Sequence, residues 1–169
     1  MRNDRTRTLS GTKITTLSVL RRKVEKLRRK GNRIVFTNGC FDILHYGHVK
    51  YLEDAKLKGD YLIVALNSDL SIKKIKAKGR PVIRQMDRLK TVAALESVDF
   101  VILFNEDNPL KLIKALKPDV LIKGADWSKN KIIGADFVES YGGKVLTVNL
   151  VKNRSTSAII DKIARNFSG

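Results

Sequence analysis

The chain has 169 residues, 43% of them hydrophobic, and a formal net charge of +17 at neutral pH. This length suits one domain with a buried core, and no apolar run approaches the roughly 20 residues that span a bilayer. The single cysteine, Cys40, excludes an internal disulfide. Because the N-terminus also lacks the apolar stretch of a secretory signal, we expect a cytoplasmic globular protein with no membrane partner.

In chain order, residues 1–12 are predicted to form a flexible, Arg-rich tail ahead of a single domain at 13–169. Residues 1–33 carry a net charge of +10, which would attract anions without choosing among nucleic acid, lipid headgroups and small phosphates. Residues 17–30 are predicted to form a helix, because apolar residues recur three and four positions apart. Gly31 and Asn32 end this helix.

Strands and helices alternate through the rest of the chain. The predicted strands are 33–39, 60–66, 99–104, 118–124 and 144–150. The predicted helices are 47–57, 85–98, 108–117, 134–143 and 155–167, with 67–83 as a basic, polar connection. The strands are continuous apolar runs, which is typical of a parallel sheet covered on both faces. We therefore predict an α/β fold, a doubly wound Rossmann-like parallel sheet of about five strands with helices on both faces.

Both histidines of the chain, His45 and His48, fall in one segment that reads FTNGCFDILHYGHVKYLEDAK. Ligands of open parallel sheets bind beyond the carboxyl ends of the strands, and residues 37–42 follow the first strand. They lead to a helix N-terminus, which favours phosphate, and Gly47 leaves room for a ligand. The pattern indicates a phosphate site, although the chain has neither a P-loop nor a G-x-G-x-x-G fingerprint.

Such a site suits nucleotidyl transfer, in which a phosphate oxygen attacks the α-phosphate of a nucleoside triphosphate and pyrophosphate leaves. The nucleophile is already an anion, so the reaction needs alignment and charge stabilisation rather than a general base. Other readings stay open: the two histidines could be surface or capping residues, and Cys40 a small packing residue. A metal site is disfavoured, because there is no third histidine and no second cysteine.

The segment TNGCFDILHYGH resembles the H-x-G-H segment of the nucleotidyltransferase superfamily. More narrowly, the chain resembles the adenylyltransferase domain of the bacterial ADP-heptose pathway, which is often fused behind a sugar kinase. This resemblance runs from about Lys13 to Ala164 and includes the segments GRPVI, KPDVLIKGADW and STSAIIDKI. It implies transfer of AMP from ATP to D-glycero-D-manno-heptose 1-phosphate, giving ADP-heptose and pyrophosphate. It also implies Mg²⁺ carried mainly by the triphosphate, and a homodimer. The sequence departs from the family in having no kinase domain, so we expect a stand-alone transferase fed by a separate kinase.

The resemblance further implies roles at matching positions. His45 and His48 would contact the triphosphate and stabilise the transition state as catalytic residues. The other implied nucleotide-binding residues are Thr37, Asn38, Gly39, Cys40, Phe41, Asp42, Gly47, Gly124, Asp126, Ser155, Thr156 and Ser157. Candidates for phosphate or sugar-phosphate contacts are Lys73, Lys74, Lys76, Arg80 and Arg88. No protein ligand for a metal is implied.

Structural roles remain open for several of these residues. Ser155 is expected to cap the last helix, which is compatible with phosphate binding. Gly124 could serve a tight turn, Asp126 could be a surface loop residue, and the lysines of 73–78 could be solvated. Arg88 could form a surface ion pair.

The substrates also leave alternatives. These are GTP with heptose 1-phosphate, the other anomer, and CTP with glycerol 3-phosphate. Cytidylyltransferases of the last kind carry an arginine where this chain has Leu150, although Arg154 is close by. Ser157 replaces the family's second threonine and keeps the hydroxyl. A non-catalytic RNA-binding module is the alternative of another class, but the chain lacks a recognisable nucleic-acid motif.

Overall fold

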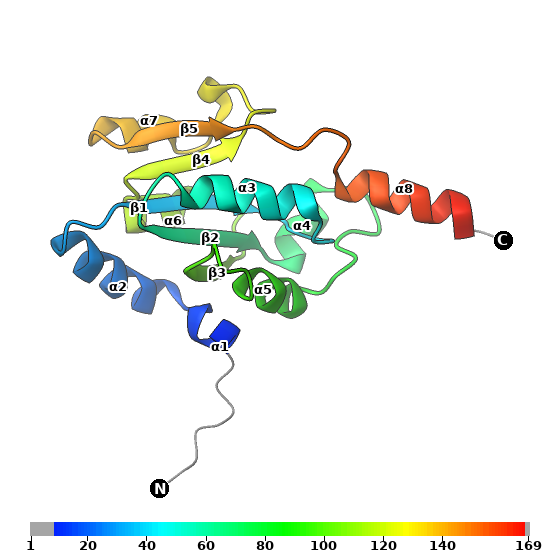
Figure 1. The fold of residues 1–169 in the computed structure, drawn as a ribbon, viewed down its shortest axis with the longest axis horizontal. Helices are drawn as coiled ribbons and strands as arrows, with labels where there is room; N and C mark the ends of the chain where they lie inside the picture. The colour runs from blue at the N-terminus through cyan, green and yellow to red at the C-terminus, as the bar shows by residue number, and fades with distance from the viewer. Residues whose placement is uncertain (1–8, 168–169) are drawn as a thin grey trace, which may run out of the picture.

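Five strands form one parallel sheet in the order β3-β2-β1-β4-β5 (Figure 1). The strands are β1 (Ile34–Gly39), β2 (Tyr61–Asn67), β3 (Phe100–Phe104), β4 (Val120–Gly124) and β5 (Lys144–Val148). The three central strands β2, β1 and β4 are mostly buried apolar runs, which is what a sheet covered on both faces requires, while the edge strand β5 has exposed residues at Lys144 and Thr147. The prediction of a doubly wound sheet of five parallel strands is confirmed.

The structure, a computed structural model, describes residues 9–167. Residues 1–8 of the predicted tail lie outside the described residues, while 9–12 begin helix α1. The helices are α1 (Leu9–Lys13), α2 (Leu17–Arg29), α3 (Tyr46–Lys56), α4 (Asp69–Ile75), α5 (Gln85–Ala93), α6 (Leu110–Leu116), α7 (Ala135–Ser140) and α8 (Thr156–Phe167), with a short 3-10 turn, η1, at Lys129–Lys131. Within this described part, no helix is long and apolar enough to cross a membrane.

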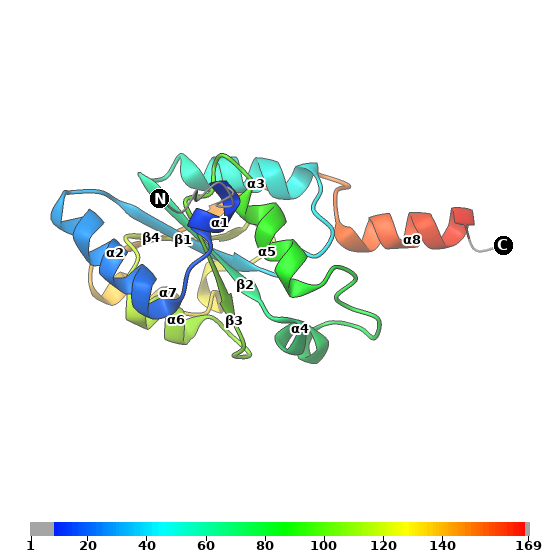
Figure 2. The same ribbon diagram turned by 90° about the horizontal axis from the view of Figure 1, so that it is seen from below.

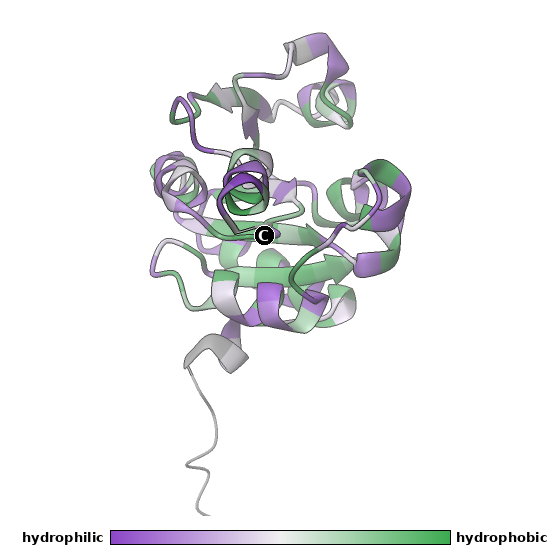
Figure 3. Cartoon of the chain, turned by 90° about the vertical axis from the view of Figure 1, so that its right-hand side faces the viewer, coloured by the Kyte–Doolittle hydropathy of each residue, from purple (hydrophilic) through white to green (hydrophobic). Residues whose placement is uncertain are grey.

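The helices cover the sheet in two layers (Figure 2). Leu20 and Val24 of α2 pack with apolar residues of α6 and α7 in one buried cluster. Leu52 of α3 and Val92 of α5 belong to the cluster on the other face. Colouring by hydropathy shows the apolar strands between these layers (Figure 3). Helix α8 follows β5 and extends away from the sheet (Figures 1 and 2).

The predicted connection at 67–83 was wrong in part, because it contains helix α4. Ser68 caps this helix by accepting a hydrogen bond from the backbone N–H of Ser71 at 3.2 Å. Among its apolar side chains only Ile72 is buried, so the segment carries almost no helical apolar pattern. Helix α5 ends at Ala93 and β5 at Val148, earlier than predicted.

The strand order places a topological switch point between β1 and β4. The chain runs from β1 outward to β2 and β3, then returns to pair β4 with the other side of β1. Thr37 of β1 is in register with Ile122 of β4, so the carboxyl ends of these two strands lie together. Open α/β sheets bind ligands in the crevice at such a point. The H-x-G-H segment follows β1, and the K-G-A-D-W segment spans the end of β4.

Candidate functional site

Two stacked imidazoles stand at the start of α3. His45 is the N-cap residue and His48 lies in the first turn of the helix. Their ring centroids are 3.9 Å apart, and the ring planes differ by 24°. Both Nδ1 atoms are buried without a hydrogen-bond partner in the described part of the chain. Nε2 is therefore the nitrogen of each ring that a ligand can reach.

Burial and neighbouring positive charge lower the pKa of both rings and favour their neutral forms. Burial lowers the pKa of His48 to about 4, the nearby His45 adds to the shift, and the Ile43 carbonyl opposes it only in part. The pKa of His45 is also lowered, first by burial and then by the positive charge of Arg154. An anion beside the rings would reverse both effects, because it favours the charged imidazolium.

The segment before α8 meets the histidines at Gly47. A Cβ atom at Gly47 would lie 2.9 Å from Cε1 of His45 and 3.1 Å from Cβ of Arg154. Any larger residue would therefore push apart the two segments. Thr156 extends the contact by donating from Oγ1 to the Ile43 carbonyl at 3.5 Å. The first turns of α3 and α8 consequently lie side by side.

Ser155 caps α8 as predicted, since its Oγ accepts a hydrogen bond from the backbone N–H of Ala158 at 3.1 Å. Ser155 and Ser157 are exposed. The unpaired backbone N–H groups of a first turn and the helix dipole both favour an anion. Two helix N-termini and two imidazoles therefore face one region, which suits a polyphosphate.

Residues 37–41 lie at and just beyond the carboxyl end of β1, beside the switch point, and are called the floor of the site. Thr37 is fully buried, and its Oγ1 lies 2.7 Å from the Tyr51 hydroxyl and 3.1 Å from the Ile122 carbonyl. The hydroxyl is thus used inside the protein. Phe41 has a left-handed backbone, with φ at 45°, and its ring lies 5.2 Å from that of His48. The ring also packs against Gly39, where a Cβ atom would lie 2.9 Å from it.

Asp42 anchors the loop that follows α4. Its buried carboxylate accepts hydrogen bonds from Nε of Arg80 at 2.5 Å, from the Val82 N–H at 3.0 Å and from the Ile83 N–H at 2.8 Å. Burial alone would raise the pKa of Asp42, but the two backbone N–H groups and the guanidinium hold it below its ordinary value. Asp42 and Arg80 are therefore brought together at the edge of the site.

Arg88 is buried and ties four segments together. Its guanidinium donates to the carbonyls of Cys40 at 2.6 Å, Asn67 at 2.9 Å and Ile83 at 3.0 Å, and to Oδ1 of Asp69 at 2.8 Å. The surface ion pair considered for Arg88 is wrong, because the side chain is 0% exposed. These contacts support the floor and the loop rather than leaving the guanidinium free for a substrate.

The predicted lysines lie on the same side as this loop. Lys73, Lys74 and Lys76 are exposed, and Lys74 pairs with Asp107 at 3.0 Å. Burial raises the pKa of the Cys40 thiol, and the positive charges of Lys76, Arg88 and Arg80 oppose this shift, Lys76 most strongly. Lys76 is therefore the one of the three that is electrostatically coupled to the floor.

The end of β4 forms another wall. A Cβ atom at Gly124 would collide with Oδ1 of Asp126 and lie 3.1 Å from Cδ2 of Leu150, so this position requires glycine. Asp126 is exposed, which is compatible with the alternative that it is a surface loop residue. Trp127 follows it and is 44% exposed.

Lys123 was missed by the sequence reading. Its Nζ donates to Oδ1 of Asn38 at 2.6 Å and lies 5.5 Å from the centroid of the Trp127 ring. Burial lowers the pKa of Lys123 to about 8, while Cys40 and Asp126 oppose the shift. The one available signal was a lysine at the end of an otherwise apolar strand, VLIKG.

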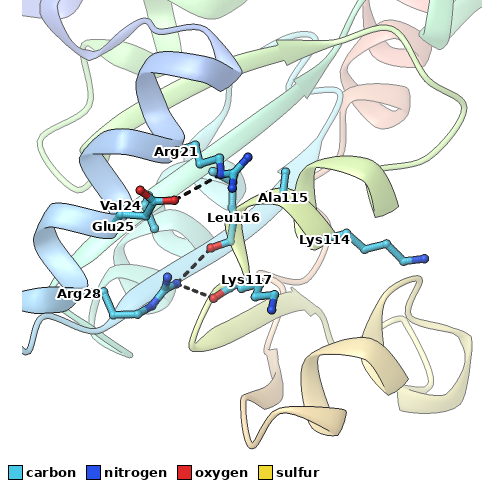
Figure 4. Close-up of a pocket in the computed structure, with 8 residues that line it drawn as sticks. All are labelled: Arg21, Val24, Glu25, Arg28, Lys114, Ala115, Leu116 and Lys117. Atoms are coloured by element: carbon cyan, nitrogen blue, oxygen red, sulfur yellow. Dashed lines mark hydrogen bonds and ion pairs between the residues drawn. The ribbon is translucent and has the colours of Figure 1, made fainter.

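A separate hollow of about 340 Å³ lies between α2 and the end of α6 (Figure 4). Arg28 lines it and donates to the carbonyls of Leu116 and Lys117 at 3.0 and 2.6 Å. Because Lys117 lies shortly before β4 begins, this hollow is at the amino ends of the strands. It is thus at the opposite end of the sheet from the histidines. Among residues 9–167, no three His, Cys, Asp or Glu side chains gather as a metal site.

Comparison with known proteins identifies the family. Residues 36–167 match the cytidylyltransferase-like family, so the chain belongs to that family of nucleotidyltransferases. The match spans the H-x-G-H segment, the K-G-A-D-W segment and α8. The expected resemblance to nucleotidyltransferases is confirmed.

The curated relatives are longer proteins. The chain is 50% identical over 158 residues to the bifunctional protein HldE of Geobacter metallireducens, covering 94% of this chain and 32% of that protein. It is 51% identical over 152 residues to the bifunctional protein HldE of Methylobacillus flagellatus, covering 90% of this chain and 31% of that protein. The chain thus spans about a third of the length of these relatives.

Solved structures share the fold. A lipopolysaccharide core biosynthesis protein from Thermoplasma volcanium is 31% identical, with a TM-score of 0.59 over 73% of this chain and 100% of that chain. Pantoate-beta-alanine ligase from Francisella tularensis is 15% identical, with a TM-score of 0.58 over 92% of this chain and 79% of that chain. The latter likeness concerns the fold alone.

Proposed function

We propose that this chain is an adenylyltransferase that transfers AMP from ATP to D-glycero-D-manno-heptose 1-phosphate, giving ADP-heptose and pyrophosphate. One observation carries the chemistry: two neutral, stacked imidazoles and two helix N-termini meet at the switch point of the sheet. The choice of substrates is supported by about 50% identity to the HldE proteins over most of this chain.

In this reaction an oxygen of the sugar phosphate attacks the α-phosphorus. The new P–O bond forms as the bond to the bridging oxygen between the α- and β-phosphates breaks, and that oxygen leaves with pyrophosphate. The attacking oxygen carries no proton, so no general base is needed. The site must align the reactants and stabilise the charge that develops on the phosphates.

His45 and His48 would direct Nε2–H groups to the triphosphate. Ser155, Thr156, Ser157 and the free N–H groups of α8 would hold its β- and γ-phosphates. Magnesium would neutralise part of the triphosphate charge. The described residues lack a cluster of acidic ligands, so its oxygens would come mainly from the nucleotide.

The base and the acceptor have alternatives. Leu150 lies against Gly124, at the position where the related cytidylyltransferases carry an arginine, which favours ATP over CTP. Arg154 is coupled electrostatically to His45 and could serve the triphosphate instead. A homodimer, as is common among relatives in the superfamily, is part of the proposal.

The test is pyrophosphate release across ATP, GTP and CTP, each with both anomers of heptose 1-phosphate and with glycerol 3-phosphate, in the presence of magnesium. We expect one clearly preferred pair, ATP with a heptose 1-phosphate. Preference for CTP with glycerol 3-phosphate would overturn the assignment of both substrates. No release with any pair, combined with RNA retention that weakens steeply as salt rises, would instead support a nucleic-acid-binding module.

A further inference from the structure

Lys123 lies on β4 beside Asn38 of β1, at the switch point of the sheet. Its Nζ bridges the two strands by donating to Oδ1 of Asn38 at 2.6 Å and lying 3.3 Å from the Asn38 carbonyl oxygen. The side chain is partly buried. Lys123 therefore presents a cation at the point where an open parallel sheet takes its ligand.

The charge on Lys123 is not balanced inside the protein. Its hydrogen-bond acceptors are neutral oxygens, and it takes part in none of the ion pairs found within residues 9–167. Asp126 interacts with it only at longer range, as does the Cys40 thiol. Burying an ammonium group without a paired anion is costly. A residue kept at such a cost in a cleft points to an anionic ligand.

The surrounding charges are arranged for that anion. Lys76 and Arg80 act electrostatically on Cys40, the floor residue that also interacts with Lys123. These cations thus approach the floor from the loop after α4, while Lys123 approaches from β4. The histidines lie at the start of α3, where Gly47 meets Arg154 of the segment before α8.

We propose that Lys123 binds the phosphate group of the sugar 1-phosphate acceptor, with Asn38 holding the ammonium in place. This inference rests on the proposed function. In an in-line displacement, the attacking and leaving oxygens lie on opposite sides of the α-phosphate. The imidazoles and α8 serve the leaving pyrophosphate, so the remaining cationic wall serves the acceptor. The exposed ring of Trp127, 5.5 Å from Nζ, offers an apolar face to the attached sugar.

Equilibrium binding measures the affinity for the acceptor and the affinity for the nucleotide separately. We would measure the Kd of heptose 1-phosphate by calorimetry in the presence of a non-hydrolysable ATP analogue, and the Kd of that analogue alone. Lys123→Gln keeps a donor for Asn38 but removes the charge, and Lys123→Arg keeps the charge. The matched control is Lys58→Gln, an exposed lysine after the end of α3. Melting curves identify folded variants, and Lys123→Met replaces Lys123→Gln if the latter does not fold.

The expected result is that Lys123→Gln raises the Kd of heptose 1-phosphate roughly tenfold or more, which is the effect of losing a charged hydrogen bond. The Kd of the ATP analogue should stay close to that of the wild type. Lys123→Arg should restore most of the acceptor affinity, and Lys58→Gln should change neither Kd.

Unchanged acceptor binding, or an equal loss of affinity for both ligands, would overturn the role of Lys123. If the wild type binds heptose 1-phosphate but releases no pyrophosphate, the proposed reaction fails and Lys123 is judged on the Kd values alone. If the wild type binds no heptose 1-phosphate, both proposals fail.

Discussion

The imidazole rings of His45 and His48 stack with their centroids 3.9 Å apart. Two charged imidazoles at this distance would repel each other, and burial opposes the charge on each. The free protein therefore holds both rings neutral at neutral pH. A triphosphate changes this balance, because its negative charge offsets both the repulsion and the loss of water.

Nucleotide binding should consequently take up protons in mildly acidic solution. The pKa of His48 in the free protein is about 4, against an ordinary value of 6.5, so between these values the free ring is mostly neutral. A bound triphosphate raises that pKa, and the ring gains a proton. Calorimetry of a magnesium-saturated ATP analogue at about pH 6, in buffers of different ionisation enthalpy, measures the uptake.

The reference for that experiment is His48→Gln, which removes the titrating ring. The nucleotide and the magnesium exchange protons of their own, and the difference between the wild type and this variant cancels them. A difference of zero would mean that the pKa of His48 does not rise on binding.

His48→Ala should lower kcat far more than it lowers stability. Donors aimed at developing charge are worth roughly a hundredfold or more in rate, whereas within the protein the ring contacts His45, Phe41 and the Ile43 carbonyl, and its Nδ1 has no hydrogen-bond partner. Steady-state kinetics and a melting curve measure the two effects. Glu53→Ala, an exposed change on the same helix, is the control. Unfolding of His48→Ala with full activity per folded molecule would make the histidine a structural residue.

Gly47→Ala should impair the reaction by displacing His45 or Arg154, although neither residue is substituted. The added methyl group would lie 2.9 Å from Cε1 of His45 and 3.1 Å from Cβ of Arg154. Either the ring or the segment before α8 must shift, and because a misplacement of about 1 Å in an aligned site costs up to about a hundredfold in rate, a smaller shift should cost less than that. We expect kcat/KM to fall while the protein stays folded. Wild-type kinetics would show that the contact between α3 and α8 is not required.

Arg88→Met should mainly destabilise the protein. Arg88 is buried and donates to three carbonyls and to Asp69, and the variant leaves these acceptors without that partner. Removing one member of a buried ion pair typically costs about 3–5 kcal/mol, which denaturant unfolding measures. If the free energy of unfolding stayed the same while KM rose, Arg88 would be a substrate contact of the kind the sequence suggested.

The sequence was sufficient for the layout of the fold and the centre of the site. Continuous apolar strands determine a covered parallel sheet, and the end of its first strand locates the two histidines. It was insufficient where the structure depends on contacts distant in sequence. Asp42 meets Arg80 and Ile83 about forty positions away, and no local pattern reveals that pairing. Helix α4 was missed because it buries a single large apolar residue, Ile72.

Lys123 illustrates a second limit. A lysine at the end of an apolar strand reads as the place where the strand reaches solvent, and only the pairing of β4 with β1 brings it to Asn38. Arg88 illustrates the reverse case. Its charge suggested a phosphate contact, whereas its hydrogen bonds to Cys40 and Asn67 reveal a support for the floor of the site.

The central claim is that an oxygen of the sugar phosphate attacks the α-phosphate of ATP. The most direct measurement is ³¹P NMR of the products formed from ATP and heptose 1-phosphate labelled with ¹⁸O in its phosphate group. The account predicts ADP-heptose with the label on the sugar-derived phosphate and in the bridge between the two phosphates, together with unlabelled pyrophosphate. Label in the pyrophosphate, or release of ADP in place of pyrophosphate, would contradict it.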